Sequence, residues 1–175
     1  AFEEKGICLR DEDFLTPLWT EDRPPVPATP AWMLTKDQAG LSVREKLAAV
    51  REKLAAQKAG AMLVTRLDSV AWLLNLRASD IAYNPFALAY CLVEENTARL
   101  FINAARVPED VQAALKAQGV ELCSYEQARS ALAAMEGPVT VLYEPAGISW
   151  AMLRALEENP AVTLQEGEEP VQALK

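Results

Sequence analysis

The sequence predicts an α/β domain whose central sheet is mixed but mostly parallel. Short apolar runs alternate with amphipathic segments from residue 42 onward, which is the pattern of strands alternating with covering helices. Two of the apolar runs, 86–93 and 98–102, are separated only by Glu94-Glu95-Asn96-Thr97, which predicts a β-hairpin. We therefore expect helices flanking a sheet in which this hairpin supplies the antiparallel part.

The first 40 residues read as a separate part of the chain. A short strand is predicted over 6–9, and a short helix or turn over 11–19. Four prolines follow within 23–30, a density that neither a helix nor a central strand tolerates. We place a domain boundary there. Residues 1–22, which lack an initiator Met, are expected to be the end of a preceding similar domain, 23–40 a linker, and 41–175 the α/β domain.

A long helix is predicted to begin at Ser42. Ser42 and Glu45 have the Ser-x-x-Glu spacing of a capping box, and Gly60 is expected to end the helix. The heptad Val-Arg-Glu-Lys-Leu-Ala-Ala occurs at 43–49 and again at 50–56, so its apolar residues fall on one face. Two heptads are too few for a coiled coil, and an amphipathic helix lying on a sheet is expected instead.

The remaining elements follow from the same reasoning. Pro108 with two acidic residues predicts a helix start, and Gly119 its end. Gly137-Pro138 is expected to stop the next helix. The predicted strands cover 61–65, 86–93, 98–102, 120–123, 139–143 and 162–165, and the predicted helices 68–74, 108–119, 125–135 and 149–158.

Composition excludes several classes of function. The net charge of -8 and the pI of about 4.7 disfavour binding to nucleic acid, because an acidic surface repels the phosphate backbone. No apolar run is long enough to span a membrane, so no membrane association is expected. The three cysteines have no CxxC spacing, which indicates a reducing compartment and no disulfide framework. Cys91 and Cys123 are expected to be buried apolar side chains.

The chain contains no histidine, which constrains its chemistry more than any motif. Ser-His and Cys-His nucleophile systems cannot be built within it. Ser149 in Gly147-Ile148-Ser149 approximates a nucleophile elbow, but a helix N-cap is the expected role. Asp68, Asp80 and Glu144 are not expected to bind Mg²⁺, because nothing in the sequence makes them converge.

The most informative stretch is the polar loop that follows the apolar helical residues 71–76. It contains Arg77, Ser79, Asp80, Tyr83 and Asn84, side chains that exceed what a simple turn needs. Two interpretations remain open. An Arg77–Asp80 ion pair could brace a loop that presents Tyr83 and Asn84 to a partner surface. Alternatively the pair is purely structural, with Asp80 capping the turn and the Arg77 stem covering apolar surface.

Several stretches resemble the aminopeptidase P family of Xaa-Pro aminopeptidases. Their positions are Leu18-Trp19 with Arg23-Pro24-Pro25-Val26-Pro27, Ala39-Gly40-Leu41-Ser42 with Glu45-Lys46-Leu47, Trp72-Leu73-Leu74-Asn75-Leu76-Arg77, Ser79-Asp80-Ile81, Tyr83-Asn84-Pro85 and 170–175. They are similar to the family's W…RP…P linker, AG-x-S-x-x-EKL helix start, WLLNLRGSDIPYNP loop and the run into its catalytic domain.

The loop departs from the family twice. Ala78 stands where Gly is usual, so a different or mildly strained backbone is expected there, and Ala82 stands where Pro is usual, which loosens the turn.

The resemblance implies the second, creatinase/prolidase-type N-terminal domain, with a ribonuclease H-like arrangement of a mixed sheet flanked by helices. In the family a C-terminal "pita-bread" domain carries two metal ions, usually Mn²⁺, on two Asp, one His and two Glu. That set is absent here, so no catalytic residue, metal or cofactor is expected in this chain. The catalytic domain would follow residue 175.

The resemblance therefore implies a non-catalytic middle domain of a bacterial-type, cytoplasmic Xaa-Pro aminopeptidase. Its expected partners are the catalytic domain of the same protein, peptide substrate at the rim of the cleft, and a second copy in a homodimer. The residues expected at the cleft or domain interface are Arg77, Ser79, Asp80, Tyr83 and Asn84. Two alternatives stay open: the N-terminal domain of a prolidase or creatinase, or a free-standing interaction module.

Overall fold

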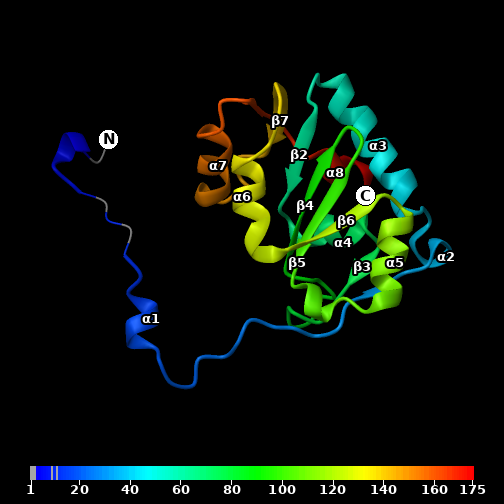
Figure 1. The fold of residues 1–175 in the computed structure, drawn as a ribbon, viewed down its shortest axis with the longest axis horizontal. Coiled ribbons are helices and arrows are strands. Elements are labelled where there is room, and N and C mark those ends of the chain that lie inside the picture. The colour runs from blue at the N-terminus through cyan, green and yellow to red at the C-terminus, as the bar shows by residue number, and fades with distance from the viewer. Residues whose placement is uncertain (1–2, 9, 11) are drawn as a thin grey trace.

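The computed structural model describes residues 3–8, 10 and 12–175, and shows an α/β unit preceded by an extended segment (Figure 1). The central sheet has six strands in the order β6-β5-β4-β2-β7-β8. Their bounds are β2 Ala61–Val64, β4 Ala89–Glu94, β5 Ala98–Ile102, β6 Val120–Ser124, β7 Val139–Tyr143 and β8 Val162–Glu166. The six strands predicted between residues 61 and 165 are thus confirmed, with β4 beginning three residues later than expected.

The sheet is mixed because one strand runs against the others. β4 pairs antiparallel with both β2 and β5, whereas β5 with β6, β2 with β7 and β7 with β8 are parallel pairs. The predicted hairpin is confirmed, with the backbone N–H of Glu94 donating to the carbonyl oxygen of Thr97 over 2.9 Å. This register places the residues that precede β4 beside those that follow β5, since Ala89 is paired with Ile102.

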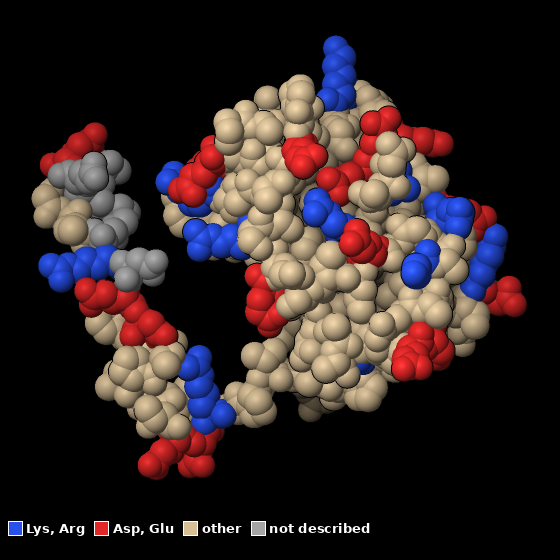
Figure 2. All heavy atoms as spheres, in the orientation of Figure 1, with Lys and Arg blue, Asp and Glu red and all other residues tan. Residues whose placement is uncertain are grey.

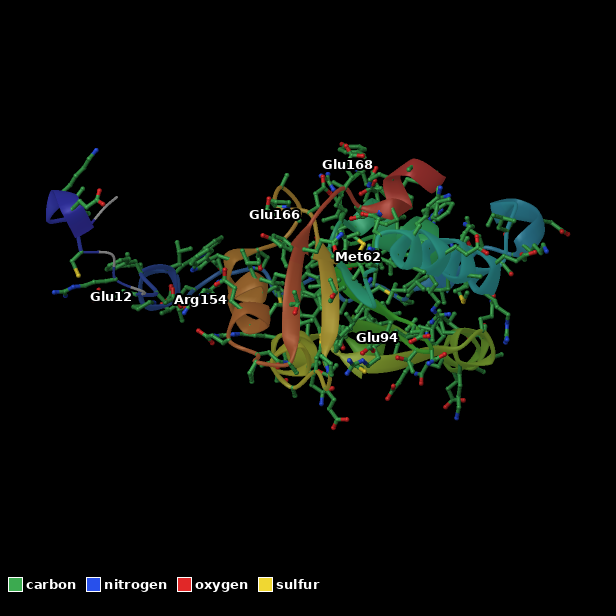
Figure 3. The ribbon with its side chains drawn as sticks, turned by 90° about the horizontal axis from the view of Figure 1, so that it is seen from above. Glu12, Met62, Glu94, Arg154, Glu166 and Glu168 are labelled. Atoms are coloured by element: carbon green, nitrogen blue, oxygen red, sulfur yellow. The ribbon has the colours of Figure 1, made fainter. Side chains whose placement is uncertain are left out.

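Helices cover both faces of the sheet. Side chains of β2 alternate, with Met62 and Val64 in the larger core cluster under α3, α4, α5 and α8, and Ala61 and Leu63 in the cluster under α6 and α7. Figure 3 shows the layers from above, with α7 on one side of β7 and β8 and with α3 and α8 on the other. The helix bounds are α3 Val43–Ala56, α4 Leu67–Leu73, α5 Glu109–Ala117, α6 Ala128–Ala133, α7 Trp150–Glu157 and α8 Pro170–Leu174.

The long helix α3 begins as predicted but ends earlier. The Ser42 hydroxyl and the Glu45 carboxylate form the expected capping box. The helix ends at Ala56, and Lys58 rather than Gly60 takes the left-handed conformation, with φ of 60°. Lys58 N–H donates to the Ala55 carbonyl and Ala59 N–H to that of Leu54, the two bonds of a Schellman motif. The expectation that Gly60 ends this helix is wrong.

The described residues before Thr29 are exposed, and most of them extend away from the α/β unit (Figure 1). They include a 3₁₀ turn at Glu3–Lys5 and the short helix α1, Leu15–Leu18. The strand expected at 6–9 is not present at residues 6–8, and Leu9 lies outside the described residues. Residues 24–28 have no regular structure, as predicted for the proline-rich stretch.

Residues from Thr29 onward join the α/β unit. Ala31 is buried, and β1, Trp32–Met33, pairs antiparallel with β3, Leu76–Arg77. Helix α2, Lys36–Ala39, carries a capping box formed by Thr35 and Gln38. The sequence did not predict β1, β3, α2 or α8. The segment 125–135 is also divided, into a 3₁₀ turn at Tyr125–Gln127 and α6.

Figure 2 shows basic and acidic side chains interspersed over the visible face of the molecule, consistent with the absence of a basic stripe in the sequence. Within the described part of the chain, no helix has the length and apolar character that crossing a bilayer requires.

Candidate functional site: the loop between β3 and β4

The loop 77–85, followed by residues 86–88 that lead into β4, is narrow, and its tip faces solvent. The Ala78 N–H donates to the Pro85 carbonyl and the Asp80 N–H to the Phe86 carbonyl, each over 3.3 Å, so the two limbs are held together. Ile81 and Asn84 form an isolated antiparallel bridge around the turn. At the tip, Tyr83 is fully exposed and has φ of 66°. A non-glycine residue in this conformation is uncommon and indicates that the surrounding structure holds it there.

The base of the loop is a buried ion pair. The Asp80 carboxylate accepts hydrogen bonds from both terminal nitrogens of Arg106, and the two side chains are 0% and 1% exposed. Arg106 ends the 3₁₀ helix η2, Ala104–Arg106, which follows β5. The register of the β4–β5 hairpin explains why Asp80 and Arg106 lie side by side, because Asp80 precedes β4 and Arg106 follows β5. Such a two-point pair fixes orientation as well as charge.

Further donors complete the environment of Asp80. The Leu88 N–H donates to Oδ2 over 2.7 Å, and the Thr29 hydroxyl to Oδ1 over 3.1 Å. Burial on its own would raise the pKa of Asp80, but the hydrogen bonds from Arg106 and Leu88 outweigh it and hold the pKa below its usual value. Asp80 is therefore a carboxylate that anchors the loop, rather than a proton carrier.

Arg77 does not pair with Asp80. Its Nη1 donates to the carbonyl oxygens of Ala71 and Leu76, the latter over 2.9 Å. Ala71 lies in the last turn of α4, where a cation is favoured by the helix dipole, and Leu76 belongs to β3. The expected Arg77–Asp80 ion pair is thus wrong, because the guanidinium is used on backbone carbonyls and Asp80 already has an arginine.

Lys46 of α3, whose side chain is buried, supports the same helix end as Arg77. Its Nζ donates to the Trp72 carbonyl over 2.8 Å and to Oδ1 of Asn75 over 2.6 Å, and it lies 4.3 Å from the centroid of the Trp72 ring. Asn75 has φ of 51° and donates through Nδ2 to the Leu41 carbonyl. Burial, followed by the charge of Arg77, lowers the pKa of Lys46. These contacts fix the point from which the loop departs.

The structure divides the five predicted residues into two groups. Arg77 and Asp80 face inward and hold the loop, while Ser79, Tyr83 and Asn84 are exposed. The strain expected at Ala78 is absent, because the positive φ angles of this region fall on Asn75 and Tyr83. Sequence reasoning missed Arg106 and Thr29. The predicted hairpin register was the one signal that could have placed Arg106 beside Asp80.

The other carboxylates considered from the sequence do not meet. Asp68 pairs with Lys175, Asp80 with Arg106, and Glu144 with Arg66 over 2.9 Å. No group of metal-ligating side chains forms among the described residues. Ser149 caps α7, as predicted, by accepting the Met152 N–H over 3.4 Å.

Comparison with known proteins places this geometry in a family. Residues 22–175 match the family model described as the creatinase/prolidase N-terminal domain. Two curated relatives are a probable Xaa-Pro aminopeptidase P of Podospora anserina, 34% identical over 90% of this chain and 24% of the relative, and Xaa-Pro aminopeptidase 2 of Mus musculus, 33% identical over 83% of this chain and 23% of the relative.

Among solved structures, the X-prolyl aminopeptidase of Caenorhabditis elegans superposes with a TM-score of 0.82 at 30% identity. The match covers 94% of this chain and 27% of that one, and its description names a cytosolic enzyme with a di-nuclear active site. The chain thus spans about a quarter of the length of these relatives. Both the family model and the superposed fold extend over nearly the whole α/β unit, and the chain belongs to the creatinase/prolidase N-terminal domain family.

Proposed function

We propose that this chain is the non-catalytic middle domain of a metal-dependent Xaa-Pro aminopeptidase, an enzyme that releases the N-terminal residue from peptides with proline second. The identities of 30–34% to proteins named Xaa-Pro aminopeptidases support this assignment over a prolidase or creatinase. The chain has no histidine, so the family's metal ligand set cannot be assembled from it. The two metal ions, expected to be Mn²⁺, would belong to a catalytic domain elsewhere in the protein.

Within that protein, we assign the loop 77–85 to the rim of the catalytic cleft. One observation supports this assignment: the aromatic side chain of Tyr83 is fully exposed, on a loop whose base is held by a buried ion pair. Exposed aromatics on rigid supports provide contact area at low entropic cost. Tyr83 and Asn84 would face the catalytic domain or the bound peptide and narrow access to the cleft.

We also propose that residues 1–22 end a preceding domain. Four large apolar side chains of the extended segment, Phe14, Leu15, Leu18 and Trp19, are exposed at helical spacing. An apolar face of this kind is normally covered by other protein.

The cytoplasmic location rests on the relative described as cytosolic. The expected homodimer remains a prediction, which light scattering of the whole protein would test.

Substitution of Tyr83 by alanine in the whole enzyme tests the role of the loop. We expect KM for an Xaa-Pro peptide to rise about fivefold with kcat nearly unchanged, because the lost contact acts on binding. Trp150→Ala is the matched control, since Trp150 is also an exposed aromatic but lies on α7 in the other layer. Equal KM values for both variants and the wild type would contradict the assignment.

A further inference from the structure

The proline-rich segment is fastened to the loop at one residue, Thr29. Thr29 is the first residue along the described part of the chain that is not exposed. Its hydroxyl donates to Oδ1 of Asp80 and accepts the backbone N–H of Ser79, each over 3.1 Å. Its backbone carbonyl accepts from Nε of Arg106 over 3.0 Å. The Ala31 N–H then donates to the Arg106 carbonyl over 2.9 Å.

The chemistry of this contact requires a hydroxyl. The Thr29 oxygen acts as donor to a carboxylate and as acceptor of a backbone N–H at the same time, which an aliphatic side chain of the same shape cannot do. Without it, Oδ1 of Asp80 would keep only its bond from Arg106, and the Ser79 N–H would lose its acceptor. The loss is costly for the buried Asp80 carboxylate, whereas the N–H of the exposed Ser79 would be left to water.

The sequence around Thr29 suits a rigid connection. Pro27 and Pro30 flank it, and each proline fixes its own φ, so little conformational entropy remains to be lost when Thr29 docks. The segment approaches the α/β unit along its lower edge in Figure 1 and enters it at this point. The Thr29 contacts therefore join the end of the extended segment to the base of the loop.

We infer that Thr29 is a positioning residue that couples the proline-rich segment to the loop 77–85 through the Asp80–Arg106 pair. The segment and the loop form one unit, and the orientation of the exposed tip depends on the docking of Thr29. The consequence for peptide binding rests on the proposed function of the loop. The structural coupling does not, and the two are tested separately.

Amide hydrogen exchange of the full chain tests the coupling. In Thr29→Val the Ser79 amide should exchange about tenfold faster than in the wild type, a factor equivalent to about 1.4 kcal/mol. Thr29→Ser, which keeps the hydroxyl, should restore slow exchange. The control is Thr97→Val, which removes a hydroxyl bonded to the Glu94 carboxylate in the β4–β5 turn and should leave Ser79 unchanged. Unchanged exchange at Ser79 in Thr29→Val, with circular dichroism showing an intact fold, would overturn the inference.

Kinetics of the whole enzyme test the consequence. We expect Thr29→Val to raise KM for an Xaa-Pro peptide about threefold with little change in kcat, Thr29→Ser to restore it, and Thr97→Val to leave it unchanged. A general loss of stability would not give this KM-only pattern with rescue by serine. If Ser79 exchanges faster but KM is unchanged, the coupling stands and the role of the loop at the cleft is contradicted.

Discussion

At the scale of single residues, the buried polar side chains decide how the loop is held. Asp80 and Asn75 were visible in the sequence as polar residues beside apolar runs, but their partners were not. Arg106 is 26 positions from Asp80, and Lys46 is 29 positions from Asn75. Local spacing carries no information on pairs so distant, so the sequence led to Arg77, the arginine nearest Asp80 in the chain.

Glu169 is a residue whose charge opposes folding. It is 3% exposed, and its Oε1 has no hydrogen-bond partner in the described structure. Burial raises the pKa of Glu169 above its usual value. The folded state therefore favours the protonated carboxyl. The stability that protonated Glu169 contributes to the folded state is fully present below the pKa of this group in the unfolded chain, and it is lost as pH rises through the pKa of the group in the folded state.

Glu169→Gln should therefore stabilise the protein at pH 7. We expect a gain of about 1 kcal/mol, or about 2–4 °C in Tm, which shrinks as the pH is lowered and the wild-type carboxyl takes up its proton. The neighbouring Glu168, exposed before α8 in Figure 3, provides the control Glu168→Gln, which should change Tm little. A Tm for Glu169→Gln at or below that of the wild type at pH 7 would contradict this account.

At the scale of elements, strongly patterned segments were predicted well and short ones were not. β5 and β7 have the predicted bounds, because apolar runs between turn residues define a buried strand. β1 and β3 contain two residues each, too few to show a period. Helix α2 follows the proline-rich stretch and lies within residues 23–40, which were predicted to be a linker.

The end of α3 shows how a glycine can mislead. Gly60 approaches β7 closely, with its N–H bonded to the Thr140 carbonyl, and a Cβ there would lie 3.2 Å from Cγ2 of Val139. The lack of a side chain at Gly60 allows this close packing. The left-handed position of the Schellman motif is occupied by Lys58 instead. A lysine in this conformation is less favourable than glycine.

Lys58→Gly should accordingly stabilise the chain by about 0.5–1 kcal/mol, since glycine adopts the left-handed conformation without steric cost. Lys53→Gly is the counterpart within α3, where the exposed lysine has helical geometry, and it should destabilise by about 1 kcal/mol. Chemical denaturation of the two variants measures both values. A loss of stability in Lys58→Gly would show that the left-handed lysine is not a strained position.

At the scale of the whole molecule, the fold class and the family were readable from the sequence, and the docking of its parts was not. Alternating strands and helices with one hairpin predicted the mixed sheet, and the 72–85 loop carried the family resemblance. The integration of Thr29 and Ala31 into the α/β unit depends on contacts with residues 79–106, which no local pattern reveals. These contacts make Thr29 and Ala31 part of the packed α/β unit.

We propose that this chain belongs to an Xaa-Pro aminopeptidase and does not itself cleave the peptide. The most direct test of this proposal is hydrolysis of an Xaa-Pro peptide in the presence of Mn²⁺, measured in parallel for the 175-residue chain and for the whole protein. We expect release of the N-terminal residue by the whole protein and none by the chain. Measurable turnover by the chain, or none by the whole protein, would contradict it.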